Sequence, residues 1–301
     1  MRRFFLLLSI GGAAWAQIGG PALGLVPDGA QVRAMVGMPA AGAVGAVISG
    51  GRELSHIAIS PAQNYAIGTA ADGSTWLVLA TGAVSQLAGA APNPSRMAVS
   101  PQGSSAALWV PAGSHFQVLS GLPGAAAARD VDATAFGEPI AFAVSDDGQV
   151  AASWPDGVRV FGSDGSVNPV SIGERVLGLA FFTQRGDLAL VTMTRVLSVV
   201  NGSVAVVHQP DGGGHGRRLP DAPAGIAVSA DNRWIVAAFR AGSVVTVNVA
   251  AATAAMSDCD CAPEGVFALG GSVFRLTSKS VKLIDAPSGA VFVVPPAGGP
   301  Q

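Results

Sequence analysis

The chain has 301 residues, of which half are hydrophobic and 12% are charged, and it contains 40 glycines and 20 prolines. So many turn-forming residues and so few charges are atypical of a helical protein and favour short strands joined by tight turns. With 17 basic and 19 acidic residues the net charge is −2, which excludes the basic balance of a nucleic-acid-binding protein and gives no attraction to anionic lipids.

The first 16 residues have the pattern of a secretory signal peptide. Arg2 and Arg3 form a basic start, residues 4–10 an apolar stretch, and Ala14-Trp15-Ala16 an A-x-A cleavage site. The apolar stretch is too short for a membrane-spanning helix, and no later stretch reaches about 18 uninterrupted apolar residues. We therefore expect cleavage near Ala16 and export to the periplasm or the extracellular space, with no membrane span.

One short apolar segment ending in a polar corner recurs five times after this leader. The Ser or Thr of each copy lies 40, 45, 38 and 46 residues from the next, at Ser60, Ser100, Ser145, Thr183 and Ser229. A period of about 40 to 45 residues that holds four short strands is typical of β-propeller blades. Each recurring segment is predicted to be the innermost strand of a blade, buried on both faces.

The strands are predicted in chain order from this repeat. Residues 22–29 and 31–37 resemble the outer hairpin of a blade whose inner strands are missing. Six full copies follow and begin near residues 55, 96, 140, 177, 225 and 265, with only a weak fourth strand, near Ala125, in the second. Turn residues such as Asp72-Gly73 and Asn201-Gly202 separate the strands, and Asn-Gly is a strong signal for a two-residue hairpin.

These elements predict one all-β domain over residues 17–296, followed by a flexible tail at 297–301. We expect a propeller of four-stranded antiparallel blades, seven in number, with six as the alternative. Propellers remove their free edge by closing the ring between the two ends of the chain. We therefore predict that residues 23–26 and 32–36 pair with C-terminal strands between 265 and 294.

The corners of the repeat resemble those of secreted bacterial β-propellers of the YVTN and WD40-like type. Ser100-Pro101-Gln102-Gly103 and Ser145-Asp146-Asp147-Gly148 are similar to their Ser-Pro-(Asp/Asn)-Gly corner, and residues 281–285 end in Asp before a turn, as theirs do. No Trp-Asp pair ends a strand and no Gly-His pair opens a repeat, so the strict WD40 signature is absent. The resemblance implies the architecture; members of such families are binding scaffolds or unrelated enzymes.

Long connections join successive copies, at residues 89–95, 121–139, 209–224 and 257–264. In a propeller these connections emerge on one face, where long loops form a binding surface or are merely tolerated insertions. The candidate binding residues in them are Arg129, Asp130, Glu138, His215, Arg217 and Arg218. The Gly-rich run at 211–218 lacks the context of a phosphate-binding loop, so we interpret it as a flexible surface loop.

No local sequence motif for a nucleophile, a zinc site or a cofactor occurs, so no catalytic residue, metal ligand or cofactor is predicted. The sequence favours a secreted, monomeric, non-catalytic scaffold that binds a protein, peptide or glycan through its long loops. The alternative is a propeller hydrolase or lactonase with its site at the mouth of the central channel. Such an enzyme would bring carboxylates or histidines from several blades together there.

Cys259 and Cys261 are the only cysteines. Export to an oxidising compartment favours a disulfide between them. In an extended strand, however, the Cα atoms of residues i and i+2 lie about 6.6 Å apart, which is near the upper limit for a disulfide. A turn before Pro263 would shorten the distance. Free thiols, a bond to another chain and a metal site remain alternatives.

Overall fold

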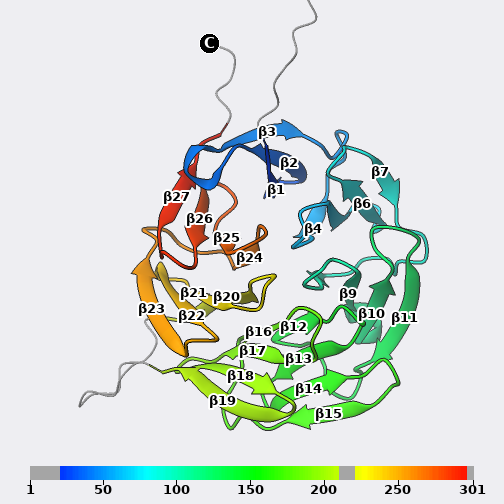
Figure 1. The fold of residues 1–301 in the computed structure, drawn as a ribbon. Helices are drawn as coiled ribbons and strands as arrows, with labels where there is room; N and C mark the ends of the chain where they lie inside the picture. Colours follow the sequence, from blue (N-terminus) through cyan, green and yellow to red (C-terminus); the bar gives the residue numbers. More distant parts are fainter. Residues whose placement is uncertain (1–20, 210–220, 297–301) are drawn as a thin grey trace, which may run out of the picture.

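The computed structural model describes residues 21–209 and 221–296, and nearly all of its regular structure is β-strand. Seven sheets follow one another around a central axis in the order of the sequence (Figure 1). The chain therefore forms an all-β propeller, and the predicted seven blades are confirmed. No helix in this part of the chain is long and apolar enough to cross a membrane.

Six of the blades are four-stranded antiparallel sheets. Blade 2 consists of β4 (Ser55–Ile59), β5 (Tyr65–Thr69), β6 (Thr75–Leu79) and β7 (Val84–Gln86). Blade 3 consists of β8 (Arg96–Val99), β9 (Ser105–Val110), β10 (His115–Ser120) and β11 (Ala127–Asp132). Blade 4 consists of β12 (Ala141–Val144), β13 (Val150–Trp154), β14 (Gly157–Phe161) and β15 (Val167–Val170). Blade 5 consists of β16 (Gly178–Phe181), β17 (Leu188–Val191), β18 (Val196–Val200) and β19 (Ser203–His208). Blade 6 consists of β20 (Pro223–Val228), β21 (Trp234–Phe239), β22 (Ser243–Asn248) and β23 (Thr253–Asp258). Blade 7 consists of β24 (Phe267–Ala268), β25 (Val273–Arg275), β26 (Val281–Asp285) and β27 (Val291–Val294).

The recurring apolar segments form the innermost strands, as predicted. β4, β8, β12, β16 and β20 each carry one of them, and all five contribute side chains to the central channel. They are not buried on both faces, however. Their central alanines, such as Ala98 and Ala143, are half-buried because the channel that they line is open.

Blade 1 is a three-stranded sheet of β1 (Ala22–Asp28), β2 (Gln31–Val36) and β3 (Ala43–Val47), with the short 3-10 helix η1 (Pro39–Ala41) before β3. A second 3-10 helix, η2 (Pro111–Gly113), joins β9 to β10. The predicted pairing of residues 23–26 and 32–36 with C-terminal strands is wrong, because β1 and β2 pair with each other and β24–β27 complete a blade without them. The ends of the chain still meet: Val44 of β3 forms a parallel bridge with Pro296, and its N–H donates to the Pro295 carbonyl over 3.1 Å.

The direction of β1 shows which strand blade 1 lacks. Leu25, within β1, lies near the end of β4, because its N–H donates to the side chain of Gln63, which follows β4. Ala30, just after β1, lies near the start of β4, because its carbonyl accepts from the N–H of Leu54, which precedes β4. β1 therefore runs opposite to the innermost strand β4, in the direction of a second strand. Because β1 is also the edge of its sheet, no described strand occupies the innermost position of blade 1. The sequence predicted an outer hairpin without its inner strands; β1 and β2 are instead the second and third strands, and only the innermost position is empty among the described strands.

The core is divided into clusters that lie between successive blades. Trp109 and Trp154 are both 1% exposed and pack in one cluster that joins blades 3 and 4. On either side of blade 1, Leu25 and Val32 pack against blade 2, while Val26 and Met35 pack against blade 7. Blade 1 therefore closes the ring by side-chain packing on both of its faces.

Side chains of the corners that follow the innermost strands hold neighbouring blades together. The Asp146 carboxylate accepts hydrogen bonds from the N–H of Gln102 in blade 3, over 2.8 Å, and of Gln184 in blade 5, over 3.0 Å. The amide of Asn232 in blade 6 bonds to both backbone groups of Thr183 in blade 5. The polar corner that marks the repeat in the sequence thus also forms hydrogen bonds between neighbouring blades.

Tyr65 makes a buried contact of the same kind, so Tyr65→Phe is expected to lower the free energy of unfolding by about 1 kcal/mol. Its side chain is 0% exposed, and its hydroxyl donates to the Gly103 carbonyl of blade 3 over 2.8 Å. Denaturant unfolding of the two proteins measures the difference. An unchanged midpoint at an unchanged slope would show that this hydrogen bond adds no stability.

The same substitution should change the response to alkaline pH. Burial raises the pKa of Tyr65 well above its usual value, so the fold favours the neutral phenol. The stability associated with this shift is present below the unfolded-state pKa of about 10 and is lost as the pH rises above it. Unfolding curves recorded across this range should therefore fall more steeply for the native protein than for Tyr65→Phe.

Candidate functional site

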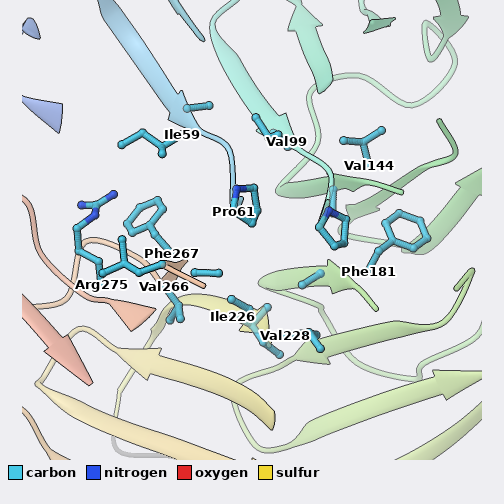
Figure 2. Close-up of a pocket in the computed structure, with 18 of the residues that line it drawn as sticks. Ile59, Pro61, Val99, Val144, Phe181, Ile226, Val228, Val266, Phe267 and Arg275 are labelled. Carbon is cyan, nitrogen blue, oxygen red and sulfur yellow. The ribbon is translucent and has the colours of Figure 1, made fainter. Parts of the chain in front are cut away.

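The central channel is the candidate site, because it is a cavity to which all seven blades contribute. Its volume is about 300 Å³, and side chains from the innermost strands and their corners surround it (Figure 2). Most of the lining side chains are aliphatic, with the aromatic rings of Phe142, Phe181 and Phe267 among them. The apolar lining follows directly from the repeat, because each of the five copies places two large apolar side chains around a small alanine.

Two residues with polar side chains line this cavity, Gln63 and Arg275. The Gln63 amide is already used by the protein: its Oε1 accepts from the Leu25 N–H over 2.7 Å, and its Nε2 donates to the carbonyls of Ala268, over 2.7 Å, and Ser60, over 3.1 Å. Gln63 thereby links blades 1, 2 and 7 at the inner edge of β1. It is a structural bridge where an innermost strand is missing.

Arg275 is buried to an unusual degree for a charged residue. It is 2% exposed, one of its terminal NH groups donates to Ser278 Oγ, and its Nε–H has no hydrogen-bond partner among the described residues. Burial lowers the pKa of Arg275 to about 10, and the charge of Glu264 acts in the opposite direction. At neutral pH the group is therefore a buried cation.

The guanidinium lies against the ring of Phe267, 4.1 Å from its centroid. Figure 2 shows Phe267 between Arg275 and the middle of the channel, and the ring is 40% exposed. The ring also rests against Gly265, where a Cβ would lie 2.7 Å from the nearest ring atom. A glycine at 265 therefore leaves the space that this ring occupies.

The strand register places Arg275 on the side of blade 7 that faces blade 1. Phe274 belongs to the core shared with blade 6, so the next residue of β25 points the other way. The cross-strand neighbours of Arg275 are Phe267 and Leu283, and Leu283 packs against β1 and β2. Arg275 thus faces the blade that lacks its innermost strand.

The candidate residues of the loop face are only partly described. His215, Arg217 and Arg218 lie outside the described residues. Arg129 and Asp130 lie in β11 and not in a connection, which corrects the predicted loop over 121–139. The strand was hard to detect because it is outermost and Val131 is its one buried residue.

The described members of this set do not form one cluster. The Arg129 guanidinium donates to the carbonyl of Gly148, in the corner that follows β12. Glu138 lies in the connection that precedes β12, at the opposite end of the same strand. Asp130 lies 3.9 Å from His115 at the start of β10. The sequence predicted that Arg129 and Glu138 share the long-loop face. This is wrong for the Arg129 guanidinium, which reaches the opposite end of β12.

Cys259 and Cys261 form a disulfide, with Cα atoms 5.2 Å apart, in the turn that follows β23. Lys282 of β26 donates to the carbonyls of Cys259 and Asp260, which attaches this turn to blade 7. In the described part of the chain no three His, Cys, Asp or Glu residues are grouped closely enough to hold a metal ion.

The chain matches no known protein-family model and no curated protein sequence. The propeller architecture and the geometry of the channel therefore carry the functional argument. Sequence reasoning missed Arg275 because it lies in the most degenerate copy. One signal was present: it is the charged residue in an otherwise apolar segment, Val273-Phe274-Arg275-Leu276.

Proposed function

We propose that this protein is a non-catalytic binding protein that holds a small, mainly apolar molecule in its central channel. The observation that carries the proposal is the channel itself, a cavity of about 300 Å³ that all seven blades line with aliphatic and aromatic side chains. Ligand pockets in proteins have this size and this mainly apolar character, with few polar groups that orient the ligand.

The rival hydrolase or lactonase finds less support in this channel. Hydrolysis requires an acid–base group, a nucleophile or a metal, and the described residues that line the cavity include no Asp, Glu, His, Ser, Thr or Cys. The lining therefore favours binding over chemistry. A binding surface for a protein, peptide or glycan on the long-loop face is a separate hypothesis, for which charge reversal at Arg217 and Arg218 is the test.

We also propose that the protein works outside the cytoplasm. The leader pattern of residues 1–16 and the disulfide between Cys259 and Cys261 both support this location, because disulfides persist in oxidising compartments. Detection of the processed chain in the periplasm or the medium, beginning near Gln17, is the expected result. Retention of the full-length chain in the cytoplasm would contradict it.

An uncharged, environment-sensitive dye such as phenylnaphthylamine tests the channel. Its fluorescence should rise on binding and saturate at one dye per protein. Ala230→Trp should weaken this binding at least about tenfold, because Ala230 is exposed at a corner that lines the channel and the larger side chain would occupy that space.

The matched control is Ala205→Trp, which places the same side chain on the exposed outer strand β19. It should leave the dye affinity unchanged, and thermal unfolding should show that both variants are folded. Equal affinities of the native protein and Ala230→Trp, or no saturable binding at all, would contradict the proposed function.

A further inference from the structure

We propose that the channel selects an anionic ligand, an apolar carboxylic acid whose carboxylate binds the guanidinium of Arg275. This inference rests on the proposed function, because it names the chemical class of the channel's ligand. The site is a buried cation without a counter-ion at the wall of an apolar cavity.

The protein itself does not neutralise Arg275. None of the ion pairs among the described residues includes it, and Glu264, the acidic residue whose charge it senses, is exposed. Ser278 and the Phe267 ring are its two described partners. Buried charges in proteins are almost always paired, because taking a charge out of water is costly unless an opposite charge compensates it.

The purely structural explanation is that the Phe267 ring alone stabilises the cation. Such a contact stabilises a cation far less than burial destabilises it, and it leaves the Nε–H without an acceptor. Arginine presents its Nε–H and a terminal N–H side by side, in the geometry that binds the two oxygens of a carboxylate. The unused donor is therefore the one that a bidentate carboxylate requires.

The ligand can reach this donor from the channel. Arg275 is one of the residues that line the cavity, and it faces blade 1, where no described strand fills the innermost position. The half-exposed Phe267 ring lies between it and the open space (Figure 2). We infer that a rotation of this one side chain gives the carboxylate access.

The remainder of the lining defines the remainder of the ligand. The amide of Gln63 is occupied by backbone groups of blades 1, 2 and 7, so it offers little to a second polar group. All other lining side chains are apolar. A ligand with one anionic head and an apolar body fits this arrangement, whereas a sugar, a nucleotide or a free amino acid would leave several polar groups unpaired.

Octanoic acid and octanol form a matched pair of probes that differ in the charged head. At neutral pH the native protein should bind the acid about ten- to a hundredfold more tightly than the alcohol, measured by calorimetry or by displacement of the neutral dye. In Arg275→Met this preference should reverse, because a carboxylate in the apolar channel would have no partner, while octanol still binds. Arg275→Lys, which keeps the charge, should retain part of the preference.

The control is Arg233→Met, which removes an arginine whose side chain is 74% exposed and should keep the full preference for the acid. Equal binding of acid and alcohol to the native protein would overturn the role of Arg275 and leave the proposed function intact. Binding of neither probe, nor of the dye, would refute both. A preference for the acid that survives in Arg275→Met would place the binding site of the anion elsewhere. If that variant does not fold, the comparison of acid and alcohol on the native protein still tests whether the channel selects an anion.

Discussion

A chain that begins at residue 51 is expected to lose the cooperative thermal unfolding shown by the chain that begins at residue 21. The shorter chain lacks blade 1, which packs against blade 2 through Leu25 and Val32 and against blade 7 through Val26 and Met35. All four side chains are at most 2% exposed. Their burial contributes roughly 1.5–3 kcal/mol each, about 6–12 kcal/mol together, which rivals the whole stability of a typical domain.

The loss should also be visible as exposed apolar surface, because blades 2 and 7 would each present an uncovered face. Circular dichroism melting and binding of a hydrophobic dye measure the two effects. The control is Met38→Ser in the longer chain, since Met38 belongs to the deleted segment but is 64% exposed and should be replaceable without effect. A sharp melting transition at an unchanged temperature in the shorter chain would show that six blades are stable by themselves.

The sequence allowed the blades to be predicted where local chemistry determines local structure. Asn201-Gly202 predicted a hairpin, and the structure ends β18 at Val200 and begins β19 at Ser203, with both turn residues at positive φ. The polar corners located the innermost strands of blades 2 to 6, and side chains in two of these corners, Asp146 and Asn232, also bond to neighbouring blades. The recurring segment is readable in five copies, whereas the sixth copy, which begins near residue 265, does not contain it.

Features that depend on how distant segments meet were not readable. The alternating pattern of residues 22–36 is the same whether the hairpin joins blade 7 or forms its own sheet, so the pairing at the closure was predicted incorrectly. The strand over 127–132 was obscured because an outermost strand needs little apolar surface. Arg275, Leu25 and Gln63 line one cavity only after the ring has closed, so no local motif could reveal the cavity that they share.

Arg275→Met is expected to raise the free energy of unfolding of the ligand-free protein by about 2 kcal/mol. Burial lowers the pKa of Arg275 to about 10, which corresponds to a penalty of about 3 kcal/mol for keeping the buried group charged. Because the folded-state pKa lies below the ordinary value, the penalty is fully present at neutral pH and is relieved only as the pH rises above about 10. Methionine removes the charge at similar volume and gives up the contacts with Phe267 and Ser278, which offset part of the gain.

A ligand that neutralises Arg275 should reverse this order of stability. At a hundredfold excess over its dissociation constant, octanoate should stabilise the native protein by about 2.7 kcal/mol and leave Arg275→Met nearly unchanged. Denaturant unfolding with and without octanoate measures both effects, and Arg233→Met, whose charge is exposed, should behave like the native protein in both. A loss of stability in ligand-free Arg275→Met would show that the guanidinium supports the fold. Stabilisation of that variant by octanoate would show that the carboxylate is bound without the arginine.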